Sequence, residues 1–221
     1  IRLVGSQPDA IEIANEANFD LASNLTVIAL AKELNGDAWA PWVSKRGEGG
    51  QGYALRRRGG GTGSGEPDWV TRGASNEEQF NTAIDGTSWH LMAGTLSGGG
   101  TKTKRLFIDG AVSAEATSVS GAINDTADAL VIGARTNFAA YWGGIVDEVR
   151  VSRIARSTTW VWAESLNALS TTAFNCYGAV SGGPEIGVLG TNLASIAAGS
   201  GSTSVALGTD FGALTLGTGA R

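Results

Sequence analysis

The stretch LFIDGAV (106–112) decides the fold of this chain. Three apolar residues of strand type are followed by Asp109-Gly110, and an Asp-Gly pair tolerates the positive φ angles of a type I′ turn. The stretch therefore predicts a β-hairpin. Comparable strand patterns, separated by turn residues, continue on both sides of it at a spacing of roughly 8 to 15 residues, which is typical of a β-sandwich.

Working outward from the hairpin, LTVIALA (25–31) is continuously apolar, as expected for a strand buried on both faces. Helical periodicity is confined to 158–168, where Ser157 is a suitable N-cap. The sequence thus predicts an all-β sandwich of two antiparallel sheets with one short helix. The remaining strands are expected at 11–13, 42–45, 52–58, 69–71, 78–84, 89–96, 129–133 and 145–151.

The composition fits many short strands joined by tight turns. The chain has 221 residues, 33 glycines, 42% hydrophobic and 17% charged residues, and a net charge of −5. This charge gives no electrostatic footprint for nucleic acid, and we interpret the only basic cluster, at 56–58, as a solvated strand edge. Cys176 is the single cysteine, so no intrachain disulfide can form. No apolar run approaches the ~20 residues of a membrane helix. The start at Ile1 is interpreted as that of a processed or excised piece of a longer precursor.

Four stretches together resemble a known family. They are NFDLASNLTVIALAKE (18–33), WVSKRGEGGQGYALR (42–56), WHLMAGTLSGGGTKTKRLFIDGAV (89–112) and LVIGARTNFAAYWGGIVDEVRVSRIARS (130–157). In order and spacing they resemble the bacterial laminin-G-like, concanavalin A-like lectin and glucanase jelly rolls. The resemblance implies a jelly roll over 1–157 and a secreted or cell-surface protein of bacterial type.

Two further segments follow the expected jelly roll. Residues 158–180 resemble the strap that follows such domains, with a short helix. Residues 181–221 are poor in charge and resemble the first part of a choice-of-anchor, immunoglobulin-like repeat.

Carboxylate positions argue against catalysis. A retaining glycosidase needs two carboxyl groups about 5–5.5 Å apart. Asp147 and Glu148 are adjacent on a predicted strand and should point to opposite faces, with Asp147 a buried hydrogen-bond acceptor. His90 is the only histidine and lies in a predicted strand without a nucleophile elbow, so a packing or cross-strand role is favoured. We expect a protein that is not an enzyme.

Aromatic side chains are the first candidates for ligand binding. Of the seven tryptophans, most lie in patterned segments and are expected in the core: Trp39, Trp42, Trp89, Trp160 and Trp162. Trp69, Tyr141 and Trp142 lie beside turn signals instead. These three are the predicted exposed platform for a glycan.

Calcium is a possible cofactor implied by the family resemblance. Calcium takes six to eight oxygen ligands. Asp125 and Asp128 are the candidate ligands, and Asp37 and Asp85 are further carboxylates that the acidic loops offer. None of them forms a recognised calcium loop, so the alternative is that these are solvated turn carboxylates.

The sequence leaves two functions open. The first is a non-catalytic module that binds glycan or a surface protein. The second is a structural subunit of a filament, sheath or surface layer, a homopolymer that assembles by strand addition through 184–221. Six apolar residues would carry that pairing: Ile186, Val188, Val205, Leu207, Leu214 and Leu216. In neither function is the chain expected to insert into a membrane.

Overall fold

The structure is a computed structural model. It describes residues 1–4, 9–14, 17–36, 39–46, 50–59, 65–73, 76–80, 84, 87–124, 126–136 and 140–170. All of these belong to one compact unit, Ile1–Thr171. The predicted repeat at 181–221, with its six pairing residues, lies outside the described residues.

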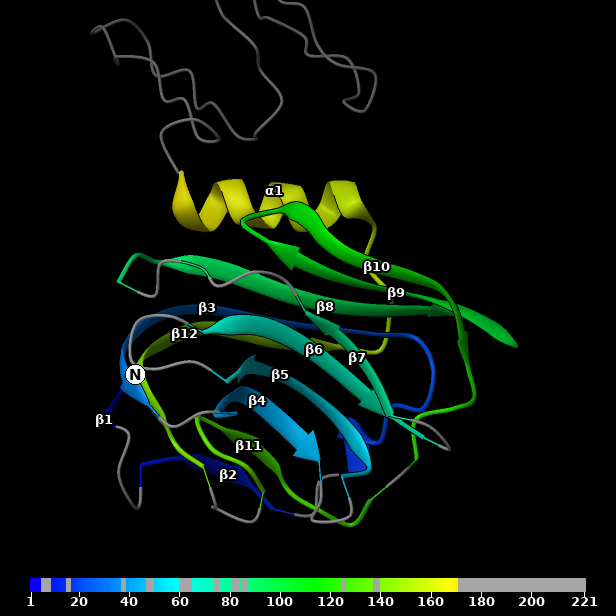
Figure 1. The fold of residues 1–221 in the computed structure, drawn as a ribbon, viewed down its shortest axis with the longest axis horizontal. Helices are drawn as coiled ribbons and strands as arrows, with labels where there is room; N and C mark the ends of the chain where they lie inside the picture. Colours follow the sequence, from blue (N-terminus) through cyan, green and yellow to red (C-terminus); the bar gives the residue numbers. More distant parts are fainter. Residues whose placement is uncertain are drawn as a thin grey trace, which may run out of the picture. The chain divides into compact units, whose positions relative to one another are not determined.

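The described strands form two six-stranded antiparallel sheets, which confirms the predicted jelly-roll sandwich (Figure 1). In spatial order, sheet A contains β1 (Arg2–Val4), β12 (Trp142–Ser152), β3 (Leu25–Gly36), β8 (His90–Gly98), β9 (Thr101–Ile108) and β10 (Ala111–Ser120). Sheet B contains β2 (Ile11–Ile13), β11 (Leu130–Ile132), β4 (Pro41–Arg46), β5 (Gly52–Arg58), β6 (Glu66–Arg72) and β7 (Asn76–Phe80). A short 3₁₀ helix, η1 (Ala17–Phe19), precedes β3.

The predicted hairpin joins β9 to β10. Its two central residues, Asp109 and Gly110, have φ angles of 52° and 82°, as a type I′ turn requires. The Asp109 carboxylate also accepts a hydrogen bond from the Leu91 backbone N–H (3.0 Å) and contacts His90 Nδ1 at 2.7 Å. The turn is therefore fixed to the neighbouring strand, and His90 has the cross-strand role that the sequence predicted.

The main core lies between the two sheets. It contains the inward-facing side chains of β3, β8, β9 and β12 from sheet A and of β4, β5 and β6 from sheet B. Among its largest members are Trp42, Tyr53, Leu55, Trp69, Met92 and Leu106. Burial of these alternating apolar side chains stabilises the sandwich, since apolar area removed from water is the main favourable term in folding.

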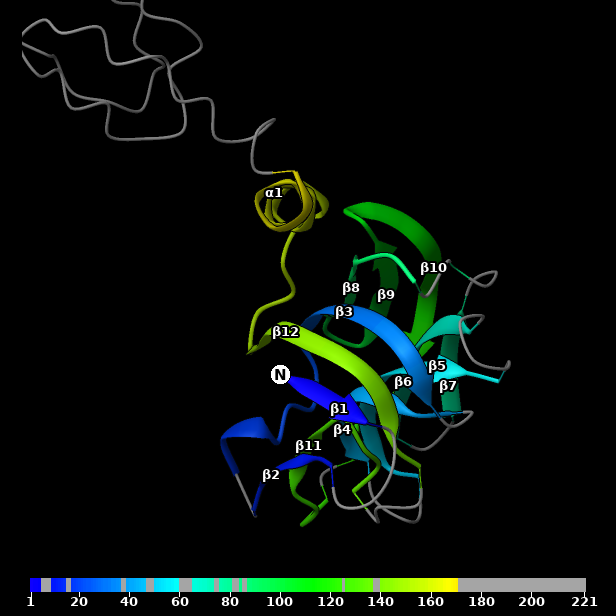
Figure 2. The ribbon, with the colours of Figure 1, turned by 90° about the vertical axis from the view of Figure 1, so that its left-hand side faces the viewer.

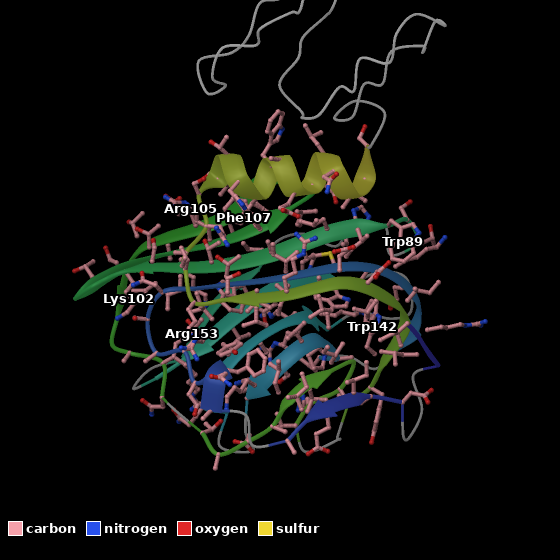
Figure 3. The ribbon with its side chains drawn as sticks, turned by 180° about the vertical axis from the view of Figure 1, so that it is seen from behind. Trp89, Lys102, Arg105, Phe107, Trp142 and Arg153 are labelled. Carbon is pink, nitrogen blue, oxygen red and sulfur yellow. The ribbon has the colours of Figure 1, made fainter. Side chains whose placement is uncertain are left out.

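A second apolar cluster lies on the outer face of sheet A, beneath α1 (Thr158–Leu169). Ser157 caps this helix by accepting a hydrogen bond from the Trp160 backbone N–H, as predicted. Val161 and Ser165, one helical turn apart, are the buried helix residues. Figures 1 and 2 show α1 on the side of sheet A that faces away from sheet B, and Figure 3 shows Phe107 on the side that α1 covers. One face of the sandwich is thus occupied by its own helix.

Candidate functional site

The predicted aromatic platform is wrong, because its three members are buried. Trp69 is 0% exposed, faces the opposite sheet from the interior strand β6, and donates its indole N–H to the Thr95 carbonyl oxygen at 3.1 Å. Trp142 is 2% exposed and packs edge-to-face on Trp42, with ring centroids 5.3 Å apart. Tyr141 is 6% exposed and packs with Val131 of β11 and with Ala134, which lies just after this strand.

The tryptophans expected in the core are only partly there. Trp42 is buried, but Trp162 on α1 is 50% exposed and Trp89, just before β8, is 38% exposed. Trp39 and Trp160 are half-buried. Turn signals in the sequence thus failed to separate exposed from buried rings. Burial depends instead on whether the ring projects from the inner or the outer face of its strand.

The calcium site proposed at Asp125 and Asp128 stays a prediction of the sequence. Asp125 lies outside the described residues, and the described residues include no group of three or more His, Cys, Asp or Glu side chains that could hold a metal. The backbone carbonyl of Asp128 instead accepts a hydrogen bond from Lys45 Nζ at 3.0 Å. The same ammonium donates to the Thr126 carbonyl at 3.0 Å and lies 2.6 Å from Asp20 Oδ1. A lysine cation therefore occupies the oxygen-lined position at this loop.

Asp147 and Glu148 also differ from the prediction. The register of β12 shifts between Asp147 and Arg150, and Glu148 has a φ angle of 47°. This bulge ends the strict alternation of faces, so both carboxylates are exposed and line one cavity of about 230 Å³ beside α1. Arg150 pairs with Glu148 at 2.7 Å and also with Glu164 of the helix. The cluster is held by ion pairs within the fold, and Asp147 is not the buried acceptor that was expected.

A second cavity, of about 190 Å³, opens at one end of the sandwich, and we call it the rim pocket. Three segments form it: the turn after η1, the facing ends of β4 and β5, and the loop after β10. Its lining residues are Phe19, Asp20, Leu21, Ala22, Lys45, Gly52, Tyr53, Ile123, Asn124 and Thr126. Arg153 and Lys102 hydrogen-bond to the flanking segments at Asn18 and Gly121, and Figure 3 shows both at the end of the sandwich opposite to Trp89.

The rim pocket combines an apolar floor with a few polar atoms. Phe19, Leu21, Tyr53 and Ile123 supply the apolar part. The Thr126 Oγ1 atom is buried and has no hydrogen-bond partner among the described residues. A buried hydroxyl without a partner costs free energy, and such a group in a native cavity calls for a bound water or ligand atom.

Tyr53 closes the inner wall of the rim pocket in its neutral form. Its hydroxyl donates to the Phe19 carbonyl oxygen at 3.0 Å. Burial, with a further contribution from the negative charge of Asp20, raises the pKa of Tyr53 well above its usual value. The hydroxyl therefore stays protonated at any physiological pH and acts as a fixed donor.

Arg56 and Arg57 of β5 are buried rather than solvated, which corrects the expectation of a strand edge; Arg58 is half-exposed. β5 lies between β4 and β6, so it is an interior strand. Arg57 is 1% exposed and pairs across the core with Glu33 at 2.9 Å. Arg56 is 4% exposed and pairs with Asp68 of β6 at 2.8 Å on the other face. Burial is tolerated because each charge has an opposite partner.

Trp39 lies in the connection from β3 to β4 with a φ angle of 68°. The left-handed conformation is uncommon for a bulky residue and costs roughly 1–2 kcal/mol. The ring lies over two guanidinium groups, at 4.8 Å from Arg56 and 5.8 Å from Arg58. Burial and the charge of Arg56 lower the pKa of Arg135, which lies beyond β11. We call Trp39, Arg56 and Arg58 the Trp39 cluster.

Comparison with protein families agrees with the architecture. The profile described as the concanavalin A-like lectin/glucanases superfamily matches residues 5–162. The chain belongs to this superfamily. No curated protein matches the chain.

Solved structures share the superfamily fold at low sequence identity. The carbohydrate-binding module CBM40 of the Ruminococcus gnavus IT-sialidase has 17% identity and a TM-score of 0.59, with 75% of this chain and 95% of that chain covered. Domain 4 of AbnA, a GH43 extracellular arabinanase from Geobacillus stearothermophilus, solved with arabinotriose, has 13% identity and a TM-score of 0.54, with 73% of each chain covered. The binding domain of Paraclostridial Mosquitocidal Protein 1 has 13% identity and a TM-score of 0.54 over 76% of this chain, which spans only 43% of that chain.

Proposed function

We propose that this chain is a non-catalytic, extracellular glycan-binding module and that the rim pocket holds the sugar. The observation that carries the proposal is the buried, unpartnered Thr126 Oγ1 in a cavity of about 190 Å³ with an apolar floor. Ligand pockets combine apolar walls with a few placed polar groups. Structural neighbours named for glycan binding, the sialidase CBM40 and the arabinanase domain, support the same class of ligand.

The size of the rim pocket limits the ligand. Drug-sized ligands occupy pockets of roughly 300–1,000 Å³, whereas this cavity has about 190 Å³. It suits one sugar residue at the end or side of a glycan, with the apolar C–H surface on Phe19 and Ile123. Thr126 Oγ1 and the Oδ1 atom of the exposed Asn124 are then available to sugar hydroxyl groups, since Asn124 Nδ2 already donates to Gln51 Oε1 at 2.7 Å.

A binding role without turnover is supported by the ionisable groups. In the rim pocket the described acidic residue is Asp20, which is paired with Lys45. The Asp147 and Glu148 carboxylates lie in the other cavity, where Arg150 bridges Glu148 to Glu164. An ion-paired carboxylate is a poor general acid, because the pair stabilises the charged form. In the described part of the chain, no helix has the length and apolarity to cross a membrane.

The test is a glycan array followed by calorimetric titration of the best ligand. Arabinotriose and α2,3-sialyllactose are included in the array as neutral and acidic references. Thr126→Val keeps the shape of the side chain and removes the hydroxyl, so it should weaken binding about tenfold, as loss of one hydrogen bond predicts. Thr101→Val, at an exposed position of β9, is the control and should bind as the parent does. No binding across the array, or equal affinity of both variants and the parent, would refute the proposal.

The structural-subunit function depends on 184–221, which lie outside the described residues. It stays a prediction of the sequence. Deleting 184–221 and comparing light scattering and electron micrographs of the two proteins tests it. Strand addition requires assembly of the full chain and loss of assembly on deletion, so two monomers or two equal assemblies would contradict it.

A further inference from the structure

The ammonium group that lines the rim pocket uses all its donors within the fold. Lys45 Nζ donates to the Thr126 and Asp128 carbonyl oxygens, both at 3.0 Å, and it lies 2.6 Å from Asp20 Oδ1. An ammonium has three N–H donors and no acceptor. Three acceptors already lie within hydrogen-bond distance of it, so Lys45 keeps no donor for a ligand.

The charge that a ligand meets in the rim pocket is therefore that of Asp20. The Asp20 side chain is 25% exposed, whereas that of its partner Lys45 is only 4% exposed. After burial, the negative charge of Asp20 is the second cause of the raised pKa of Tyr53. The carboxylate thus acts on the inner wall of the pocket, although it is paired.

The other polar side chains of the rim pocket are neutral. The Tyr53 hydroxyl donates its hydrogen to the Phe19 carbonyl, and Asn124 Nδ2 donates one of its two to Gln51 Oε1. Thr126 Oγ1 is buried and has no partner among the described residues. Oxygen atoms with free acceptor capacity therefore remain on Tyr53, Asn124 and Thr126, and the hydrogens still available come from uncharged groups. This set suits the hydroxyl groups of a sugar.

Two cations beside the rim pocket are bound to the flanking segments. Arg153 donates to Asn18 Oδ1 at 3.0 Å, and Lys102 donates to the Gly121 carbonyl. Neither side chain lines the cavity. A carboxylate that entered the pocket would lose its water without gaining an opposite charge, which is costly. It would also be repelled by the like charge of Asp20.

We infer that the rim pocket takes a neutral sugar residue and excludes a sugar acid, with Asp20 as the residue that sets this specificity. The inference rests on the glycan-binding function proposed above and names the class of its ligand. Recognition of a carboxylate uses charge-assisted donors such as a guanidinium or a free ammonium. Among the described lining residues the cation is Lys45, and its donors are taken.

The experiment compares uronic acids with their uronamides, which have nearly the same shape without the charge. The probes are the methyl glycosides of glucose, galactose and mannose, each with its uronic acid and its uronamide. They are titrated into the full chain at pH 7 and followed by NMR. At least one sugar and its uronamide should bind about tenfold or more tighter than the acid, a difference of about 1.4 kcal/mol. Thr126→Val should weaken both neutral probes, which would place them in the rim pocket.

A pair of charge variants tests the role of Asp20. Asp20→Asn removes the negative charge and keeps an oxygen for Lys45, so it should narrow the gap between acid and uronamide by a factor of about three or more. Glu115→Gln changes the net charge of the chain equally, at an exposed ion pair of β10, and should leave the gap as in the parent.

The outcomes separate this inference from the proposed function. Equal affinity of acid and uronamide in the parent would overturn the inference but not glycan binding, and this comparison does not depend on the folding of Asp20→Asn. Equal gaps in Asp20→Asn and Glu115→Gln, or neutral binding that Thr126→Val leaves unchanged, would overturn it too. Absence of binding by every probe would also overturn it, and the glycan array then decides separately whether the chain binds glycan.

Discussion

Gly94 in β8 should not tolerate even a methyl group. A Cβ atom built on Gly94 would lie 2.2 Å from Cδ2 of Trp69, where ordinary contacts begin at 3.4 Å. The Trp69 ring has little room to retreat, since it is 0% exposed and its indole N–H is bonded to the Thr95 carbonyl. Gly94→Ala must therefore displace either the ring or the strand.

The expected magnitude follows from these two effects. Inserting a methyl group into a packed core typically costs about 1–3 kcal/mol. Displacing Trp69 by more than an ångström would also break its hydrogen bond to Thr95, at about 1 kcal/mol. Gly94→Ala should thus lower the free energy of unfolding by about 2–4 kcal/mol. For a domain of this size the melting temperature should fall by roughly 4–16 °C.

Urea unfolding followed by tryptophan fluorescence measures this change. Gly99→Ala is the matched control, because a Cβ atom there meets nothing within 4 Å. It should change the free energy of unfolding by less than about 0.5 kcal/mol. If Gly94→Ala proved as stable as Gly99→Ala, the packing of sheet A on Trp69 described above would be incorrect.

Two further predictions concern buried ionisable groups. Glu33→Gln leaves the buried Arg57 charge without its anion and should destabilise the fold by about 3–5 kcal/mol. Glu115→Gln, which removes the acidic partner of an exposed ion pair, should cost less than about 1 kcal/mol in the same urea assay. Similar losses of stability in the two variants would contradict the buried Arg57–Glu33 pair. Folding raises the pKa of Tyr53 above its unfolded value near 10, so the unfolded chain loses this proton first and stability falls as the pH rises above about 10. Between pH 9 and pH 11 the parent should lose more stability than Tyr53→Phe does, and equal losses would show that Tyr53 is not shielded from water.

Elements set by local chemistry could be predicted from the sequence. The Asp109-Gly110 turn and the helix capped by Ser157 depend on residues within a few positions of each other, and both were predicted. The sandwich followed from the rhythm of strands and turns. The bulge at Asp147–Arg150 was missed, because alternation was assumed to continue through β12.

The sites depend on contacts distant in sequence, and they were predicted poorly. Arg57 is buried because Glu33 lies opposite it in the other sheet, and Trp69 is buried because Gly94 makes room for its ring. The rim pocket joins segments around residues 20, 50 and 124, none of which carries a binding motif. For Trp39, a clue was present: it is a bulky residue in a short connection just before Pro41, where β4 begins.

Glycan binding by this domain is proposed to take place in the rim pocket. The most direct measurement is mapping of backbone amide chemical shifts by NMR during titration with the best array ligand. We predict that the largest shifts fall on the residues around 19–22, 52–53 and 123–126, and that Thr126→Val suppresses them at the same ligand concentration. Shifts confined to other parts of the sandwich, with those segments unchanged, would contradict the claim.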